Sequence, residues 1–339
     1  MQGKAQLRGA WRRRGWHLAP GEPQRLEPLD ACERKAVHRS AWLALGERVT
    51  VPPSLRLVRE GFPERPAYDT AVSRALMLRV AEGREPETFR LHRPGATLAF
   101  GRRDASRPGY PTAVTAATAA GFAAVQRLAG GQAAVFHQET LAFSHEVADP
   151  APRRGIHERF CVISDVMSAA LRRLGVDARV GEVAGEYCGG AYSVNARGIR
   201  KLVGVGQRII TGAAHVGGVV VVAGSDRVRH VLVPVYAALE IPWQPVTVGS
   251  VEDEIGPLSA EVVAEAIIDE LDLRYDLVEG QLNRDTLELG EALEADHCVH
   301  RTMHHCAHDA VSRTSVESPR QVRKDGGPLA SAADRNWRV

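Results

Sequence analysis

The sequence predicts an α+β fold in which a mixed, largely antiparallel sheet is flanked by helices. Two observations carry this prediction: segments with apolar residues at three- and four-residue spacing, and consecutive strand-like segments joined by tight turns after Tyr192. Strands and helices do not alternate as repeated β-α-β units, which argues against a doubly wound parallel sheet. No internal repeat is visible in the sequence.

The first elements in chain order follow from local patterns. Strands are predicted at residues 55–58, 88–92 and 97–100, the last two separated by a Pro-Gly turn, and helices at 68–80, 112–120 and 156–174. Gly121 and Gly175 close two of these helices, in positions that tolerate a left-handed backbone. The helix 156–174 has the clearest apolar face and is therefore expected to pack on a core.

The remaining elements are mostly strands. Residues 192–194, 199–208 and 213–223 are predicted as strands, the first two joined by a turn at 195–198. The apolar run 219–222 must be buried on both faces of its strand. Ser259 is a suitable N-cap for a helix that continues to Leu271 and is expected to be the last ordered one.

Composition excludes several classes of protein. The chain has 339 residues, of which 44% are hydrophobic and 25% charged, and its net charge is only +2. A nucleic-acid binder usually shows a stronger positive field, and no apolar run approaches the roughly 20 residues that cross a bilayer. The basic N-terminus is not followed by the apolar stretch of a signal peptide. We expect a cytoplasmic protein without nucleic-acid or membrane partners.

The two ends of the chain differ from its middle. Residues 1–51 hold ten Lys and Arg against five Asp and Glu and are predicted to form a basic, mobile extension. Residues 283–339 lose apolar periodicity and are predicted to be a disordered tail. The folded domain is therefore expected at 52–282.

Two segments hold the residues best suited to chemistry. In 127–137, Gly130 and Gly131 lie between two strands, preceded by Arg127 and followed by His137. Such glycines let main-chain N–H groups approach a carboxylate, phosphate or carbonyl oxygen, although a plain Gly-Gly hairpin is an equal alternative. The chain has no phosphate-loop lysine at this glycine pair, and Gly204-Val-Gly206 opens no helix, so neither standard nucleotide fingerprint is present.

The second segment is 185–208. Cys188 lies in a glycine-rich loop, where it is either a presented thiol or an inert small residue. Lys201 lies inside a predicted strand beside apolar residues. A lysine there is costly to desolvate unless it meets an anion or a polarised oxygen, so a functional role is favoured over a surface lysine.

Together these segments resemble the lipoate and biotin protein ligase superfamily, in the branch of lipoate-protein ligases and octanoyltransferases. The resemblance covers about residues 53–282. The family's Arg before a Gly-Gly loop ending in Val-x-His is matched by Arg127, Gly130, Gly131, Val135 and His137. Its Lys-x-x-Gly-x-x-Gln-Arg element is matched by Lys201, Gly204, Gln207 and Arg208, and its Gly-Arg strand end by Gly101 and Arg102. The implied fold is that of biotin/lipoate ligases, which is similar to class II aminoacyl-tRNA synthetases.

The resemblance implies an enzyme that attaches a lipoyl or octanoyl group to a lysine of lipoyl-domain carrier proteins. Cys188 and Lys201 are the implied catalytic residues, and the implied substrate-binding residues are Arg127, Gly130, Gly131, His137, Gly204 and Gln207. The preferred mechanism is transfer from octanoyl-acyl carrier protein through a Cys188 thioester, with Lys201 polarising the acyl carbonyl and no cofactor. The Gly130 and Gly131 amides are expected to assist Lys201, and residues 219–222 to line an acyl tunnel.

Two alternatives remain open. An ATP-dependent ligase would use ATP and Mg with free lipoate or octanoate and pass through an acyl-adenylate. A non-catalytic module would bind lipoate or the carrier protein. Gln132 stands where the family has Gly or Arg, and one additional residue separates the Gly pair from His137. Residues 283–339 do not resemble the accessory domain that often follows in the ligases.

Histidines occur at two further places where a metal site or a catalytic base is conceivable. The segment 298–308 contains two cysteines and four histidines, but its spacing matches no common zinc site, so no metal is predicted. His137 is better explained as a structural histidine than as a catalytic base.

Overall fold

The computed structural model describes residues 52–299. The predicted N-terminal extension, residues 300–339 of the predicted tail and most of the Cys/His segment 298–308 lie outside this range.

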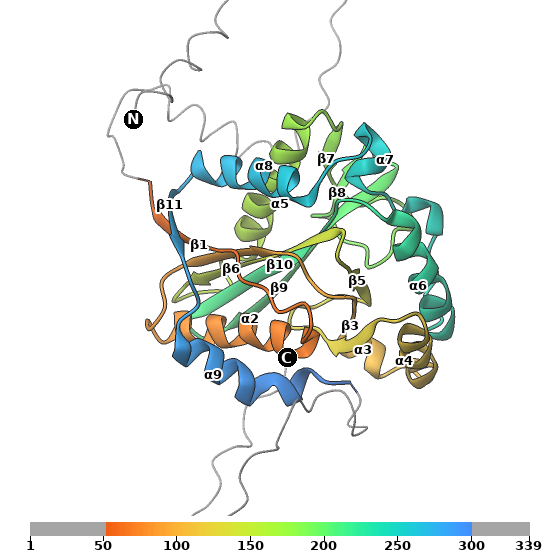
Figure 1. The fold of residues 1–339 in the computed structure, drawn as a ribbon, viewed down its shortest axis with the longest axis horizontal. Helices are drawn as coiled ribbons and strands as arrows, with labels where there is room; N and C mark the ends of the chain where they lie inside the picture. Colours follow the sequence, from red (N-terminus) through yellow and green to blue (C-terminus); the bar gives the residue numbers. More distant parts are fainter. Residues whose placement is uncertain (1–51, 300–339) are drawn as a thin grey trace, which may run out of the picture.

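A large mixed sheet runs through the described part of the chain (Figure 1), with eight strands in the order β11-β1-β2-β6-β10-β9-β8-β7. In that order the strands are β11 (Asp276–Gly280), β1 (Ser54–Val58), β2 (Thr88–His92), β6 (Thr140–Ala148), β10 (Ala213–Val221), β9 (Arg200–Ile210), β8 (Val194–Ala196) and β7 (Ala178–Val180). Strand β1 is parallel to both its neighbours, and the other pairs are antiparallel. The predicted α+β class is confirmed.

Helices cover both faces of this sheet (Figure 1). On one face lie α5 (Ile156–Arg173) and α8 (Ala260–Asp272), and on the other α2 (Pro66–Ala81) and α9 (Arg284–Leu293). The predicted apolar face of α5 is buried in the main core, with Ile163, Met167 and Leu171 at most 1% exposed. Gly121 and Gly175 have φ of 79° and 100°, which is the left-handed backbone expected at these helix ends.

A smaller three-stranded sheet lies beside the large one, in the order β4-β3-β5. Its strands are β4 (Ala123–Gln126), β3 (Thr97–Phe100) and β5 (Ala134–Phe136), and the helices at this end are α3 (Arg102–Ala105), α4 (Tyr110–Ala119) and α6 (Ser225–Ala238). The connection to α8 contains the short η1 (Pro245–Thr247) and α7 (Val251–Ile255), and η2 (Glu294–His297) follows α9. This smaller sheet shares a second core with α4 and α6.

The sheet register explains two of the sequence patterns. Val220 and Val222 lie in the core under α5 and α8, whereas Val221 lies in the core under α4 and α6, so burial of both strand faces is confirmed. The predicted turn at 195–198 joins β8 to β9, with Arg197 and Gly198 at positive φ. Strand β8 begins only at Val194.

The prediction that order ends at Leu282 is wrong, because α9 follows and packs along α2. Asn283 caps α9 by accepting a hydrogen bond from the Thr286 N–H at 2.9 Å. The Thr286 hydroxyl donates to Glu85 at 2.6 Å, and Gly290 lies so close to α2 that a Cβ there would approach Val72 to 2.9 Å. Leu287 adds an apolar contact with the core of α2, but α9 is only 10 residues long and its short apolar face was not recognised in the sequence.

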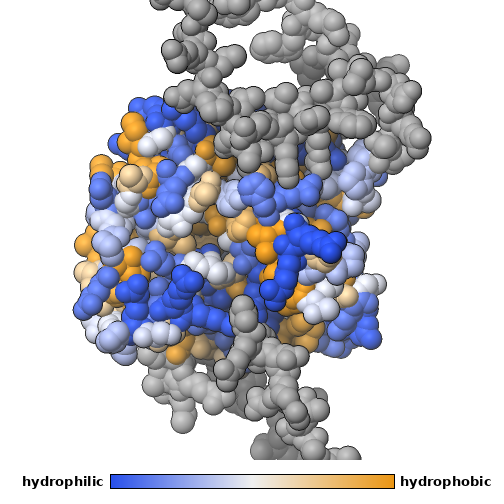
Figure 2. Space-filling model, turned by 180° about the vertical axis from the view of Figure 1, so that it is seen from behind, coloured by the Kyte–Doolittle hydropathy of each residue, from blue (hydrophilic) through white to orange (hydrophobic). Residues whose placement is uncertain are grey.

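The surface is mixed in character. On the face shown in Figure 2, hydrophobic residues lie in small groups between hydrophilic ones. Among residues 52–299, no helix is long and apolar enough to cross a membrane.

Candidate active site

Two loops from different sheets meet at the predicted site. One is the loop 127–133 between β4 and β5, and the other is the loop 183–193 between β7 and β8. Gly131 lies where they touch, with φ at 117°, and a Cβ on it would lie 2.8 Å from the Cys188 sulfur and 2.9 Å from Arg127 Nη1. Only a residue without a side chain allows this approach.

The Cys188 sulfur faces hydrogen-bond donors of the opposite loop. The Gln132 N–H donates to Sγ at 3.2 Å, and Arg127 Nη1 lies 3.5 Å from Sγ. Arg127 is itself fixed, because Nη1 also donates to the Gln132 carbonyl at 2.7 Å. A main-chain N–H and a guanidinium are the surroundings that a sulfur carrying negative charge requires.

Tyr236 of α6 ties the two loops together. Its hydroxyl accepts a hydrogen bond from the Cys188 N–H at 3.0 Å and donates to the Ala133 carbonyl at 2.9 Å. Burial raises the pKa of Tyr236 well above its ordinary value, so the hydroxyl keeps its proton and can donate. The relative position of Cys188 and the Arg127 loop is therefore fixed by a third element.

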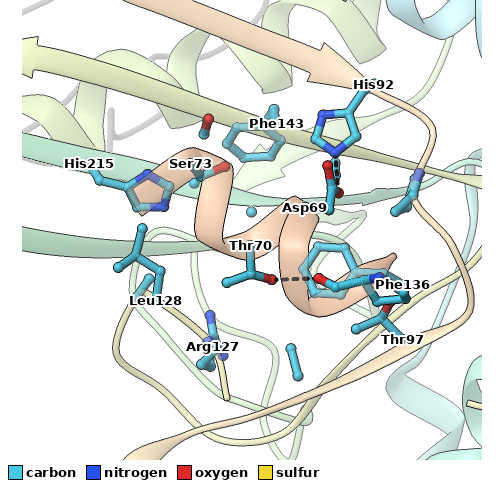
Figure 3. A pocket seen from close by; sticks show the side chains of 18 residues that line it. Asp69, Thr70, Ser73, His92, Thr97, Arg127, Leu128, Phe136, Phe143 and His215 are labelled. Atoms are coloured by element: carbon cyan, nitrogen blue, oxygen red, sulfur yellow. Dashed lines mark hydrogen bonds and ion pairs between the residues drawn. The ribbon is translucent and has the colours of Figure 1, made fainter. Parts of the chain in front are cut away.

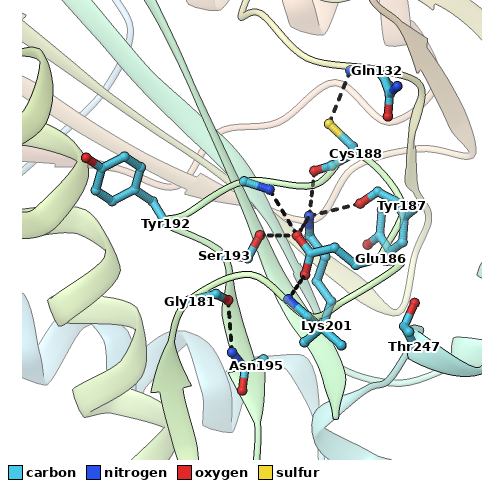
Figure 4. Close-up of polar contacts among 12 residues, drawn as sticks. Gln132, Gly181, Glu186, Tyr187, Cys188, Tyr192, Ser193, Asn195, Lys201 and Thr247 are labelled. Atoms are coloured by element: carbon cyan, nitrogen blue, oxygen red, sulfur yellow. Dashed lines mark hydrogen bonds and ion pairs between the residues drawn. The ribbon is translucent and has the colours of Figure 1, made fainter. Parts of the chain in front are cut away.

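Lys201 of β9 is 1% exposed and lies under the Cys188 loop (Figure 4). Its Nζ donates to Glu186 Oε1 at 2.9 Å, to the Tyr187 carbonyl at 3.1 Å and to the Cys188 carbonyl at 2.8 Å. An ammonium group has three hydrogens, and these three acceptors use them all. The hairpin thus folds Lys201 back to Cys188, but Lys201 contacts the main chain of the cysteine and not its sulfur.

The sulfur lies in an arginine-rich cleft of about 750 Å³. Five arginines line it: Arg102, Arg103, Arg107, Arg127 and Arg208. Burial, and then the nearby charges of Arg102 and Arg74, lower the pKa of Arg208 below its ordinary value, although the group remains protonated. Three carboxylates, Asp104, Glu182 and Glu186, line the cleft as well, so the arginines leave a positive excess that favours an anionic ligand.

A smaller cavity of about 100 Å³ lies behind the Arg127 loop (Figure 3). Residues Arg127, Leu128 and Ala129 line both the cavity and the cleft, so they separate the two spaces. Phe136 and Phe143 give the cavity apolar walls. The apolar walls and the position next to the loop that holds Arg127 suit part of an acyl chain.

The cavity also has a polar side, formed by Asp69, His92 and His215. Burial opposes the charge on Asp69, but Arg90 and His92 outweigh it and hold the pKa of Asp69 well below its ordinary value. Burial, together with Arg90, lowers the pKa of His92. Asp69 is therefore an anion beside a neutral imidazole, compensated by the Arg90 guanidinium.

Residues 65–272 match the family model of the lipoyl protein ligase A/B catalytic domain. The chain belongs to this family. It carries the family's catalytic domain and is therefore an enzyme of lipoate or octanoate transfer. No curated relative matches the chain.

Solved structures agree with this lipoyl-ligase family fold. A lipoate-protein ligase A bound with ATP aligns at a TM-score of 0.59 and 20% identity, covering 71% of this chain and 94% of that one. A Thermoplasma acidophilum protein with bound lipoic acid gives 0.58 and 19%, covering 72% and 95%. A bi-partite lipoate protein ligase from an archaeal lipoylation system of the same organism, described with its E2 lipoyl domain, gives 0.56 and 18%, covering 73% and 93%.

Three predicted site residues of this lipoyl-ligase family domain, Gly130, Gly204 and Gln207, make contacts that support the loops and strands around the cleft. Gly204 lies beside Lys201, so that a Cβ there would be 3.4 Å from Lys201 Cε. The Gly130 N–H donates to the Gln207 carbonyl at 3.4 Å and is thus directed at β9. The Gln207 side chain accepts from Arg159 at 2.9 Å and donates to the Ile156 carbonyl at 3.2 Å, at the start of α5. The amide at the sulfur is that of Gln132 and not that of Gly130.

Two predicted parts of the site, His137 and residues 219–222, line neither the cleft nor the cavity. His137 is fully buried and lines neither space; its Nδ1 accepts from the Glu139 N–H at 3.2 Å, and burial lowers its pKa to about 4. The β10 wall of the cavity is formed by His215, Gly217 and Gly218, so the expectation that residues 219–222 line a tunnel is wrong. Valines 220–222 pack in the two cores instead.

Glu186, Tyr236 and His215 were not predicted from the sequence as site residues. Glu186 stands two residues before Cys188, and the need of a strand lysine for an anion could have identified it. Tyr236 comes from α6, whose sequence period was not recognised. Within residues 52–299, no group of three or more His, Cys, Asp or Glu side chains is placed to hold a metal ion.

Proposed function

We propose that the protein transfers an octanoyl or lipoyl group to a lysine of lipoyl-domain proteins through a thioester on Cys188. The observation that carries this proposal is the position of the sulfur. It lies in the arginine-rich cleft with the Gln132 N–H and Arg127 directed at it, next to the wall that separates the cleft from the cavity. A bound acyl chain would extend past Arg127 into the cavity.

The reaction has two steps of acyl transfer. In the first, the Cys188 thiolate attacks the carbonyl of an acyl thioester, the Cys188 S–C bond forms, and the donor leaves as its thiolate. In the second, the ε-amine of the carrier lysine attacks the enzyme thioester, the S–C bond breaks, and the amine loses a proton to water. The Gln132 N–H and Arg127 are the groups near enough to stabilise the sulfur charge at both steps.

The cleft favours an acyl donor that carries phosphate. Acyl carrier protein holds its acyl group on a phosphate-linked arm, and its own surface is acidic. The five arginines of the cleft provide a counter-charge for such a donor. No nucleotide takes part in this reaction.

The ATP-dependent ligase is the second candidate function. The same arginines fit the phosphates of ATP, with Mg as the accompanying ion. Lys201 argues for the transferase, because its three hydrogens are directed at Glu186 and at two main-chain carbonyls rather than into the cleft.

Intact mass measurement tests the proposal. The full chain is incubated with octanoyl-acyl carrier protein alone and, in parallel, with octanoate, ATP and Mg. We expect one octanoyl mass from the first mixture, mapped to Cys188 and removed by hydroxylamine, and its passage to a lipoyl domain when that acceptor is added. Cys188→Ser is expected to reduce transfer at least about a hundred-fold, because a serine hydroxyl without a neighbouring base is a poor nucleophile.

The opposite results have clear meanings. Acceptor modification that needs ATP and survives Cys188→Ala assigns the enzyme to the ligases. Binding of octanoate without any transfer in either mixture assigns a non-catalytic module.

A further inference from the structure

Glu186 is the most fully satisfied carboxylate at the site, and nothing described so far gives it a part in the reaction. Its side chain is completely buried. Oε1 accepts from Lys201 Nζ at 2.9 Å, from the Ser193 hydroxyl at 2.6 Å and from the Gly190 N–H at 3.2 Å. Oε2 accepts from the Val183 N–H at 3.0 Å.

These donors come from both ends of one loop and from the strand beneath it (Figure 4). Val183 begins the loop and Ser193 ends it, so one carboxylate closes the segment 183–193. Cys188 lies midway between the two ends. A buried carboxylate with this number of donors resists displacement, because any shift of the loop would leave charged and polar groups unpaired.

The backbone at Cys188 needs this support. Its φ is 44°, a left-handed conformation that a residue with a side chain keeps only where its surroundings enforce it. Lys201 holds the Tyr187 and Cys188 carbonyls, while Glu186 holds Lys201. The Glu186–Lys201 pair, which lies beneath the loop, therefore maintains the backbone conformation in which Sγ accepts the Gln132 N–H.

We infer that Glu186 is a positioning residue for Cys188, acting through Lys201 and Ser193. This inference rests on the proposed thioester function of Cys188. In this arrangement Lys201 anchors the cysteine loop, because its three hydrogens are directed at Glu186 and at two carbonyls of that loop. Glu186 itself touches neither the sulfur nor the cleft-facing donors.

The test measures acylation of Cys188 by octanoyl-pantetheine, followed by intact mass, with kcat and KM determined separately. Glu186→Gln should lower kcat about a hundred-fold, because small misplacements of a reacting group cost factors of that size. KM should stay within about twofold, since the arginines and the cavity are untouched.

Ser193 provides a milder pair of variants that keeps the ion pair intact. Ser193→Ala removes one donor to Glu186 and should lower kcat about tenfold, and Ser193→Thr, which keeps the hydroxyl, should restore it. Glu254→Gln is the matched control, because Glu254 is a carboxylate with a side chain 7% exposed that pairs with Arg197 away from the cleft. It should lower the melting temperature without changing kcat.

The outcomes separate the two proposals. If the wild-type chain forms no adduct on Cys188, the proposed function fails. If the wild type is acylated but Ser193→Ala keeps full kcat, the positioning role is overturned. It is also overturned if Glu254→Gln and Ser193→Ala lose the same melting temperature and lower kcat equally. Should Glu186→Gln fail to fold, the Ser193 pair decides the question.

Discussion

His137 illustrates how burial changes a single residue. It is fully buried behind β5, its Nδ1 accepts the Glu139 N–H, and its Nε2 has no partner among the described residues. Burial, helped by the charge of Arg227, lowers its pKa to about 4. The imidazole is therefore neutral at pH 7 in the folded protein and becomes protonated far more readily in the unfolded chain.

This difference predicts acid sensitivity. The folded pKa of about 4 lies below the ordinary value of 6.5, so His137 contributes stability above pH 6.5 that is lost as the pH falls towards 4. The full contribution is about 3 kcal/mol. Urea unfolding at pH 7.5 and pH 4.5 should show a smaller loss of unfolding free energy in His137→Gln than in the wild type.

Burial also lowers the pKa values of His92 and His297, which therefore destabilise the fold at acid pH in the same way. His137→Gln should thus reduce the loss of unfolding free energy between pH 7.5 and pH 4.5 without abolishing it. Acyl transfer by His137→Gln should remain near the wild-type rate, because His137 lines neither the cleft nor the cavity. Equal acid sensitivity of the two proteins would show that His137 does not carry the effect.

Cys188 and Lys201 could be predicted as candidate site residues from the sequence, but the partners that the structure gives them could not. A lysine inside an apolar strand requires an anion or a polarised oxygen, and Lys201 indeed meets Glu186 and two carbonyls. Which acceptors the Lys201 ammonium group meets depends on how the loop 183–193 folds over β9. No local sequence pattern encodes that arrangement. For the same reason the amide of Gln132 at the sulfur was not predicted; the Gly130 and Gly131 amides were expected to stabilise the acyl oxyanion.

At the scale of elements, α2 and α9 depend on each other. Tyr68 and Val72 are buried on α2, and the Tyr68 hydroxyl donates to the Leu287 carbonyl of α9 at 3.3 Å. Beyond α9, Arg65 pairs with Glu294 at 2.6 Å, and His297 Nδ1 lies 2.7 Å from the Gln126 carbonyl of β4. The segment 284–297 thus reaches from α2 to the strand that leads to Arg127.

A chain that ends at Leu282 is therefore expected to be less stable than one that ends at Val299. Uncovering two large apolar side chains costs about 4 kcal/mol, and for a domain of this size that lowers the melting temperature by about 10 °C. Thermal unfolding of the two chains measures the difference. An unchanged melting temperature in the shorter chain would restore the boundary predicted from the sequence.

The elements that the sequence predicted and those it missed differ in how they are stabilised. Helix α5 carries its own apolar period and was predicted almost to its bounds. Helix α9 has only Thr286 and Gly290 buried; Leu287 packs, partly buried, against the core of α2, and the other contacts are a glycine approach, a cap and ion pairs. Glycines, capping residues and charged residues are common in loops as well. They therefore did not indicate a helix in the sequence, where the packing partner α2 is not visible.

For the whole molecule, the distribution of charge matters more than its sum. The net charge is +2, and this near balance indicated no field that would attract a polyanion. The fold nevertheless gathers five arginines from separate segments around one cleft. A composition cannot reveal this arrangement, because the residues involved are up to about a hundred positions apart.

This arrangement predicts a salt effect that depends on the donor. The KM for octanoyl-acyl carrier protein should rise as ionic strength increases from low to physiological values, whereas the KM for uncharged octanoyl-pantetheine should change little. Arg103→Gln should raise the first KM several-fold and leave the second unchanged. Arg84→Gln makes the same change of charge outside the cleft and serves as control; a similar rise with Arg84→Gln would rule out a specific cleft effect.

The pairing of β1 with β11 has a consequence for how the protein is made. Residues 54–58 hydrogen-bond in parallel with 276–280, and the side of α2 that faces away from the large sheet is covered by α9 and η2. Because synthesis proceeds from the N-terminus at about 5–20 residues per second, α2 leaves the ribosome many seconds before its cover exists. During that interval its apolar face is open to chaperones and proteases, and a ribosome that stalls before residue 284 releases a product that cellular quality control can recognise.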